Sequence, residues 1–282
     1  MPEIDNGLII LDKPYGHVAH EITTYVKKLL GVRRSGHAGT LDPDVSGVMP
    51  IAIGKATKLL GYIAGRKKTY VCIMKIKDRS VSDATLRQLF KDFTGELTQT
   101  PPKKSAVRKV PRKRIVYYIN FLERKDNLVL FEAEVDAGTY IRTLCEDMGK
   151  KIGGARMEEL RRIAVGKITE QQAVKLQDLI DAVWLYKHGK PQQLEKMIKK
   201  PDDYIELKKV VIRDNALQSI KNGAQLMAPA VASIDDGVKK DELVKLYSES
   251  GKFAGIGKAA ADKDQLLKMK TGLAVSIERM HL

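Results

Sequence analysis

The residues best suited to chemistry form the stretch HAGTLDP at positions 37–43. Gly36 and Gly39 flank a histidine, and Pro43 keeps Asp42 out of the helical region of backbone conformation. A rigid loop that presents one carboxylate suits nucleophilic or general-base catalysis. The same pattern is also typical of an ordinary turn with Asp as the turn former, and taken alone it favours that interpretation.

Composition indicates the class of partner. The chain has 282 residues, of which 43% are hydrophobic, enough for a buried core. It carries 50 Lys and Arg against 35 Asp and Glu, a formal net charge of +15. Such a surplus makes nucleic acid the leading candidate partner, an anionic membrane the second, and solubility the simplest alternative.

The sequence predicts a cytoplasmic protein with no membrane partner. No apolar run approaches the ~20 residues of a membrane span. The N-terminus, with Glu3 and Asp5, lacks the basic and then apolar pattern of a signal sequence. Cys72 and Cys145 both lie in apolar surroundings, which argues against a disulfide scaffold, an iron–sulfur centre and a Cys-based zinc site.

The positive charge is concentrated in the first part of the chain. Residues 1–205 hold 37 basic and 25 acidic residues, whereas 206–282 hold 13 and 10. Within 99–114 there is no acid, three prolines favour an exposed loop, and the basic residues are Lys103, Lys104, Arg108, Lys109, Arg112, Lys113 and Arg114. We interpret this stretch as an arm that follows RNA phosphates; a solvated loop is the alternative.

Hydrophobic periodicity predicts alternating strands and helices. The expected strands are 7–11, 49–53, 69–76, 115–122 and 128–135, and the expected helices are 18–30, 55–64, 82–93 and 141–148. Gly31 should end the first helix, and Ser82 should cap the third. A break at 199–203 precedes a tail of short strands and turns, which predicts domains at 1–205 and 206–282.

The stretch around Asp42 gains meaning from the motifs that accompany it. Residues 37–50 resemble the catalytic motif of the TruB/dyskerin class of pseudouridine synthases. The family's other motifs follow in the family order: the opening strand and loop GLIILDKP at 7–14 with Gly16 and His20, KTY at 68–70, the basic loop at 99–107, AGTYIRTL at 137–144 and ELRR at 159–162. Ordered motifs over most of residues 7–187 are far more specific than one motif.

The tail carries a second resemblance. NGAQLMAP at 222–229 is similar to the signature of the PUA RNA-binding domain, with AGIGKA at 254–259 as its closing strand. This implies RNA contacts at Gly223 and Ala224. Together the resemblances imply an α+β fold: a catalytic core with a central mixed, mostly antiparallel sheet flanked by helices, and a small β-rich pseudo-barrel PUA domain.

The family chemistry requires one ionised carboxylate. Pseudouridine forms when the N1–C1′ bond breaks, the base turns and C5 joins C1′; no redox change occurs, so no cofactor and no metal are expected. The resemblance makes Asp42 the carboxylate, in a water-poor pocket. Burial disfavours a charged carboxylate, so a cation must lie nearby, and the resemblance places Arg142 there. Tyr70 would stack on the uracil, with its hydroxyl near the C5 proton.

Three further residues are expected to contact the substrate. His37 would fill the space left by the flipped base, and Leu160 would form the apolar wall of the pocket. Lys13 would contact a phosphate. The simpler alternatives are a hydrogen-bonding His37 within its loop, a solvated Lys13, a buried strand aromatic at Tyr70 and a surface arginine at Arg142, with Leu160 a packing residue in either case.

The resemblance leaves three functions open. The first is the catalytic subunit of an H/ACA ribonucleoprotein, in which a guide RNA selects uridines in rRNA and in some tRNA. Its partners would be small zinc-ribbon and β-barrel accessory proteins and a kink-turn-binding ribosomal-type protein attached through the guide. The second is a standalone synthase acting on the tRNA TΨC loop. The third is a non-catalytic RNA-binding scaffold, which would leave Asp42 without a role.

Overall fold

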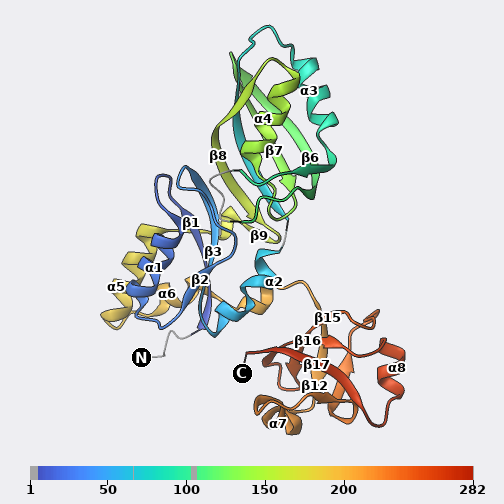
Figure 1. The fold of residues 1–282 in the computed structure, drawn as a ribbon. Coiled ribbons are helices and arrows are strands. Elements are labelled where there is room, and N and C mark those ends of the chain that lie inside the picture. The colour runs from blue at the N-terminus through green and yellow to red at the C-terminus, as the bar shows by residue number, and fades with distance from the viewer. Residues whose placement is uncertain (1–5, 66, 103–106, 282) are drawn as a thin grey trace. The chain divides into compact units, whose positions relative to one another are not determined.

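The structure, a computed structural model, describes residues 6–65, 67–102 and 107–281. It consists of two compact units, Met1–Lys199 and Lys200–Leu282 (Figure 1). The segment just after Lys199 packs with the second unit, because the Tyr247 hydroxyl donates to Asp202 Oδ2 at 2.8 Å and Lys245 Nζ donates to the Asp202 carbonyl at 3.1 Å. The first unit therefore ends a few residues before position 205.

The first unit contains a sheet of eleven strands among its described residues. They are β1 (Asn6–Lys13), β2 (Ser35–His37), β3 (Val45–Gly54), β4 (Lys68–Ile76), β5 (Gly95–Gln99), β6 (Arg112–Lys125), β7 (Leu128–Val135), β8 (Ala155–Val165), β9 (Ile168–Thr169), β10 (Val174–Lys175) and β11 (Ile198–Lys199). The main path runs β10-β1-β3-β8-β4-β7-β6-β5. The β1–β10 and β3–β8 pairs are parallel and the rest are antiparallel.

Helices cover this sheet in two groups. They are α1 (Ala19–Leu30), α2 (Leu60–Ala64), α3 (Asp83–Asp92), α4 (Ile141–Lys151), α5 (Leu176–Lys187) and α6 (Gln192–Met197), with short 3₁₀ turns at Lys55–Leu59 and Glu170–Gln172. Figure 1 shows α1, α5 and α6 beside β1, and α3 and α4 beside β6, β7 and β8. The two halves meet where β3 pairs with β8 at only three positions, 45–47 with 160–162.

Local sequence signals explain most of these elements. Gly31 adopts a φ of 69° directly after α1, where a left-handed residue ends the helix. Ser82 caps α3 by accepting a hydrogen bond from the Thr85 N–H at 3.1 Å. The expected helix at 55–64 is instead a 3₁₀ turn followed by the short α2. Strand β4 is buried at alternate positions rather than throughout.

Strand β8 was not predicted. Its sequence, ARMEELRRIAV, has only short apolar stretches and no clean alternation, yet it lies in the middle of the sheet between β3 and β4. Its two ladders hold it there, since β4 alone pairs with it at nine positions. Tertiary pairing has overridden local propensity at this strand.

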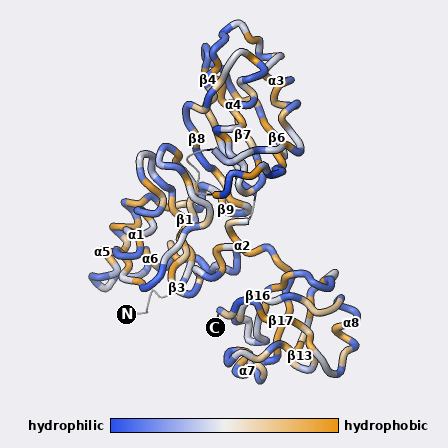
Figure 2. The backbone as a smooth tube through the Cα atoms, viewed as in Figure 1, coloured by the Kyte–Doolittle hydropathy of each residue, from blue (hydrophilic) through white to orange (hydrophobic). Residues whose placement is uncertain are grey.

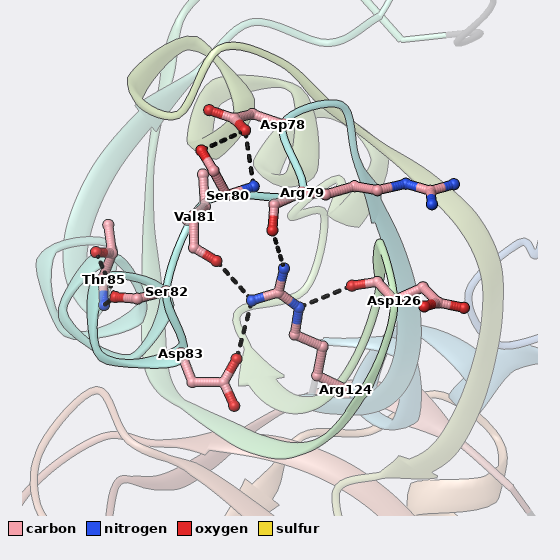
Figure 3. A network of polar contacts seen from close by, with 9 residues as sticks. All are labelled: Asp78, Arg79, Ser80, Val81, Ser82, Asp83, Thr85, Arg124 and Asp126. Carbon is pink, nitrogen blue, oxygen red and sulfur yellow. Dashed lines mark hydrogen bonds and ion pairs between the residues drawn. The ribbon is translucent and has the colours of Figure 1, made fainter.

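One arginine fixes the far end of the β6–β7 hairpin (Figure 3). The Arg124 guanidinium donates to the carbonyls of Arg79, Val81 and Asp126 and to the Asp83 carboxylate, at 2.5 to 3.0 Å. These acceptors belong to the turn after β4, the start of α3 and the hairpin turn. The guanidinium therefore joins three segments with a single side chain.

The second unit is a six-stranded sheet with short helices. Its strands are β12 (Lys208–Ile212), β13 (Leu226–Met227), β14 (Val231–Ile234), β15 (Leu243–Ser248), β16 (Phe253–Ala259) and β17 (Leu273–Met280), in the order β13-β17-β16-β15-β12-β14. Its helices are α7 (Leu217–Lys221) and α8 (Lys263–Lys268), with 3₁₀ turns at Pro201–Tyr204, Asp214–Ala216 and Ala228–Ala230. The expected closing strand at 254–259 is β16, an inner strand, because β17 follows it and pairs with its far edge.

The predicted fold class is confirmed. The chain combines a mixed, mostly antiparallel sheet flanked by helices with a smaller β-rich unit. Each unit has its own buried apolar cluster, and Figure 2 shows hydrophobic residues along the inner strands, β1 and β3 included. No helix in the described part of the chain is long and apolar enough to cross a membrane.

Candidate active site

The loop between β2 and β3, residues 38–44, carries Asp42, and we call it the Asp42 loop. Its ends are fixed by main-chain hydrogen bonds from Ala38 N to the Pro50 carbonyl at 2.8 Å and from Val45 N to the Asp42 carbonyl at 3.1 Å. Gly39 has a φ of 78°, which an L side chain rarely adopts. The loop is thus a tight connection between the paired strands β2 and β3.

Arg142 faces Asp42 from the first turn of α4. Its Nη2 donates to Asp42 Oδ2 at 2.7 Å, across 100 positions of sequence. Gln99, at the end of β5, fixes the approach to this helix: its side-chain amide donates to the Tyr140 carbonyl at 3.2 Å and accepts from the Tyr140 N–H at 2.9 Å. A helix start held in this way gives the guanidinium a defined position.

The exposure of this ion pair differs from expectation. The side chain of Asp42 is 57% exposed and that of Arg142 is 34% exposed. The carboxylate therefore lies at the open side of its site rather than in a water-poor interior.

A cavity of about 470 Å³ opens beside the pair. It is lined by the Asp42 loop, β4, β8 and residues 137–142, and it brings together Asp42, Tyr70, Arg142 and Leu160. Tyr70 is 8% exposed. The volume lies in the range of small-ligand pockets, and one wall offers apolar and aromatic surface while the other offers charge.

Lys13 does not lie where a phosphate contact would require. It is fully buried at the end of β1, and its ammonium donates to the carbonyls of Pro14, Pro43 and Val45 at 2.9, 3.1 and 2.8 Å. All three donors are thus used on main-chain acceptors. Burial lowers the pKa of Lys13, and Asp44 and Asp42 act in the opposite direction. The geometry makes Lys13 a support beneath the Asp42 loop.

His37 lies at the start of the Asp42 loop, outside the cavity wall. Its Nδ1 is 2.9 Å from Thr23 Oγ1 and its Nε2 is 3.2 Å from Thr40 Oγ1. Burial and, secondly, the Arg162 charge lower the pKa of His37, which favours a neutral ring near pH 7. Its ring therefore joins α1 to the loop, as the simpler interpretation of the sequence would have it.

Two buried cations at the cavity were missed from the sequence. Lys68 is 5% exposed and Arg162 is 1% exposed, and both line the cavity beneath Gly39. Burial, reinforced by the Arg162 charge, lowers the pKa of Lys68 to about 8, against an opposing contribution from Asp136. Lys68 belongs to the KTY motif and Arg162 to the ELRR motif. Side-chain alternation along each strand turns these two side chains towards the cavity.

No cluster of three His, Cys, Asp or Glu side chains able to hold a metal ion occurs among residues 6–65, 67–102 and 107–281. The cavity lining contains one carboxylate, two tyrosines and three cations: Asp42, Tyr70, Tyr140, Lys68, Arg142 and Arg162. This set suits acid–base and nucleophilic chemistry on a nucleobase.

Comparison with known proteins identifies the family. Residues 27–141 match the model of the TruB family pseudouridylate synthase N-terminal domain, 142–205 match the tRNA pseudouridylate synthase B C-terminal domain, and 208–281 match the PUA domain. "Probable tRNA pseudouridine synthase B" of Methanosarcina barkeri is 40% identical over 98% of this chain and 82% of its own length. The protein of the same name from Methanocaldococcus jannaschii is 39% identical over 99% and 84%.

The chain belongs to the TruB family of pseudouridylate synthases. It is therefore an isomerase that converts uridine in RNA to pseudouridine. Among solved structures, a Cbf5-Nop10-Gar1 complex matches with a TM-score of 0.90 and 38% identity, over 99% of this chain and 85% of that one. An H/ACA RNP bound to a substrate RNA containing 2′-deoxyuridine matches with a TM-score of 0.89 and 36% identity, over 98% and 85%.

The basic stretch of this pseudouridine synthase borders the cavity. Lys103 and Lys104 lie outside the described residues, while Arg108 and Lys109 are exposed. Lys109 Nζ donates to the Pro102 carbonyl at 2.6 Å. The stretch is not a loop throughout: Gln99 ends β5 and 112–114 begin β6.

The PUA unit presents its signature at the surface. Gly223, with a φ of 101°, and Ala224 form an exposed turn after α7. Their N–H groups donate back to the carbonyls of Ile220 and Ser219, at 3.0 Å each. Among the described residues, apart from Gly223 and its two chain neighbours, no atom lies within 4 Å of where a Gly223 Cβ would be.

Proposed function

We propose that this synthase is the catalytic subunit of an RNA-guided particle. The observation that carries the proposal is its likeness, over 98–99% of the chain, to proteins solved in a Cbf5-Nop10-Gar1 complex and in an H/ACA RNP with substrate RNA. A guide RNA would select the uridine by base pairing, while the protein reads RNA shape and supplies the cavity, a division of labour known in guided nucleic-acid enzymes.

Asp42 acts in this proposal as the catalytic carboxylate, as nucleophile or as base. Arg142 keeps it charged and oriented through the 2.7 Å hydrogen bond. The exposed carboxylate is then covered by the incoming base, so that the pair loses its water when substrate binds. Positioned charge in such a closed site contributes more than it would in water.

Tyr70 and Leu160 receive the flipped base. The phenol ring offers a stacking surface, and its hydroxyl lies where the C5 proton leaves. Leu160 supplies an apolar wall opposite the charged pair. His37 affects RNA binding indirectly, because it holds the Asp42 loop at the mouth of the site. Lys13 supports the same loop from beneath.

RNA is held outside the cavity by two surfaces. The basic residues Lys103, Lys104, Arg108 and Lys109 follow RNA phosphates, and the turn at Gly223 and Ala224 grips the guide. The targets are uridines in rRNA and in some tRNA. Small zinc-ribbon and β-barrel proteins, and a kink-turn-binding protein attached through the guide, complete the particle.

A cytoplasmic location fits the cysteines. Cys72 and Cys145 are both buried and free, with their sulfur atoms 3.8 Å apart. A reducing compartment maintains such a neighbouring pair as thiols.

A second candidate is a standalone synthase acting on tRNA. It is favoured by the names of eight archaeal relatives, each of which is called "Probable tRNA pseudouridine synthase B". Both candidates use the same cavity, so the geometry of Asp42 and Arg142 does not separate them.

Tritium release from RNA labelled at uridine C5 tests the proposal. The purified chain is given rRNA fragments and tRNA, with and without an H/ACA guide and the accessory proteins. The guided enzyme releases tritium from rRNA only with the guide and its partners. Equal release from tRNA in every mixture, with none from guided rRNA, would favour the standalone enzyme.

A further inference from the structure

We propose that Arg162 is a positioning residue that sets the separation between the Asp42 loop and the Tyr70 hydroxyl. The inference deepens the proposed function, because it rests on the roles given to Asp42 and Tyr70. One buried guanidinium bonds the base of the loop and stands directly across the sheet ladder from Tyr70. The relative placement of the two reactive groups would then depend on this one side chain.

Arg162 bonds the Asp42 loop and lies next to Tyr70. Its Nε donates to the Val48 carbonyl at 2.8 Å and its Nη2 donates to the Gly39 carbonyl at 2.9 Å. Tyr70 is its cross-strand neighbour in the β4–β8 ladder, and both side chains line the cavity. Val48 and Gly39 stand on either side of Asp42 in sequence, so the guanidinium spans the base of the Asp42 loop.

Arg162 lies at the cavity face beside a bulge in the sheet. The β4–β8 ladder pairs Thr69 with Ala164 but Tyr70 with Arg162, which leaves Ile163 as an extra residue on β8. Bulges are frequent next to active sites. Before the bulge the register is regular, so Arg162 shares a face with Leu160, which pairs with Cys72.

A glycine permits β3 to approach Arg162 from the other side. Gly47 pairs with Arg162 in the parallel β3–β8 ladder and has a φ of 109°. A Cβ at Gly47 would lie 2.1 Å from the Arg162 carbonyl oxygen, so only glycine fits. The seam between the two halves of the sheet is thus built around this arginine.

The partners of Arg162 do not balance its charge in the way of a structural ion pair. Within the described part of the chain its hydrogen bonds go to two main-chain carbonyls, and its side chain is 1% exposed. Burial lowers the pKa of this guanidinium, and the neighbouring Tyr70 opposes the shift. Burying such a charge costs free energy that an apolar residue would avoid.

The arrangement has a consequence for proton transfer. When C5 joins C1′, the C5–H bond breaks, its electron pair restores the ring, and the proton passes to a base while N1 gains one. Arg162 is the cross-strand neighbour of Tyr70 at the cavity wall, so its position bears on where the Tyr70 oxygen lies during this transfer. A small shift of this oxygen, or of Asp42 relative to it, would slow isomerisation strongly.

The test is a double-mutant cycle between Arg162→Lys and Tyr70→Phe, with single-turnover rates at saturating RNA. Lysine keeps a charge but lacks the fork that reaches both carbonyls. We expect Arg162→Lys to slow isomerisation about 100-fold while RNA affinity stays within about twofold. In the Tyr70→Phe background the same change should cost much less, because its route through the hydroxyl is gone.

Controls separate positioning from folding. Arg156→Lys alters an arginine of the same strand that is 65% exposed and paired with Glu158, and it should leave the rate unchanged. Arg162→Gln replaces Arg162→Lys if the latter does not give the wild-type circular dichroism and melting temperature. RNA deuterated at uridine C5 supplies a second readout: an isotope effect that appears or grows in the Arg162 variant shows that C5 proton removal has become limiting.

Two results would overturn the proposal. In one, the rate reductions of the Arg162 and Tyr70 single variants multiply fully in the double variant, and no isotope effect develops. In the other, the folded Arg162 variants act within threefold of the wild-type rate. Both differ from failure of the proposed function, in which Asp42→Asn would itself remain active.

Discussion

Asp42 owes its position to side chains that the local sequence does not supply. Lys13 donates to the carbonyls of Pro43 and Val45, while Arg162 donates to the carbonyl of Gly39. Both cations are buried, and the carboxylate itself is exposed beside Arg142. A preorganised loop of this kind holds its reactive group without reorganisation when the substrate arrives.

Asp42→Asn should abolish isomerisation and leave RNA affinity nearly unchanged. The amide has the shape of the carboxylate but cannot act as nucleophile or base, so the rate should fall by about three orders of magnitude or more. Tritium release and a filter-binding titration measure the two quantities. Asp44→Asn, two residues along, is the matched control. Turnover of Asp42→Asn within tenfold of wild type would remove Asp42 from the chemistry.

Lys68 should make stability depend on pH. Burial lowers its pKa to about 8, whereas a lysine in the unfolded chain titrates near about 10.4. Between these two pKa values the unfolded chain binds more protons than the folded one, so the free energy of unfolding rises as pH increases. Below about pH 8 the buried lysine is charged in the folded protein, and its full destabilising effect is present. The gain amounts to about 3 kcal/mol at most.

Lys68→Met should remove that dependence. The unfolding free energy of the variant relative to wild type should fall steadily from about pH 8 to about pH 10, as measured by urea titration. Lys67→Met, an exposed neighbour paired with Glu134, is the control. If the free energies of unfolding of wild type and Lys68→Met changed with pH in parallel, the fold would not lower the pKa of Lys68.

At the scale of elements, the β3–β8 seam is the feature on which the site depends. Gly47→Ala should destabilise the fold by about 3 kcal/mol or more, because the new methyl group would overlap the Arg162 carbonyl and the φ of 109° would be strained. Gly61→Ala, in α2 with open space around it, should instead be neutral or stabilising by about 0.5 kcal/mol. Equal melting temperatures for the two variants would contradict the close approach of β3 and β8.

The basic stretch should act through charge alone. Neutralising Lys103, Lys104, Arg108 and Lys109 together should weaken RNA binding broadly and reduce the salt slope by about 3, since each phosphate contact to a single strand contributes about 0.7. The measurement is RNA affinity against salt concentration. Neutralising the exposed Lys91 and Lys125 supplies the control. An unchanged slope in the fourfold variant would make the stretch a solvated loop.

At the scale of the whole molecule, the two units have separate apolar cores. Deleting residues 200–282 should therefore leave the first unit folded and its cavity complete. Guide-directed release of tritium should fall sharply, because the PUA unit is proposed to grip the guide, whereas weak guide-independent release should persist. Circular dichroism of the truncated chain checks its fold. Guide-directed turnover at the wild-type rate would show that the second unit is not the anchor.

Local signals in the sequence determined many of the elements. The capping Ser82, the terminating Gly31 and the alternation of 128–135 act within a few residues, so their structures follow from the chain itself. The motifs likewise identified Asp42, Tyr70, Arg142 and Leu160, and these four line one cavity. Their roles remain predictions, of which the Asp42 and Tyr70 variants above test two.

The tertiary structure alone decided what supports those residues. Arg142 meets Asp42 across 100 positions and Arg162 meets Gly39 across 123, distances over which periodicity carries no information. Strand β8 lacks a clean pattern of its own, and only its pairing with β4 puts Arg162 opposite Tyr70. Lys13, an expected phosphate contact, is buried because three carbonyls converge on it only after β1 and the Asp42 loop have come together. Register and burial arise from pairing between distant segments, and these set the site.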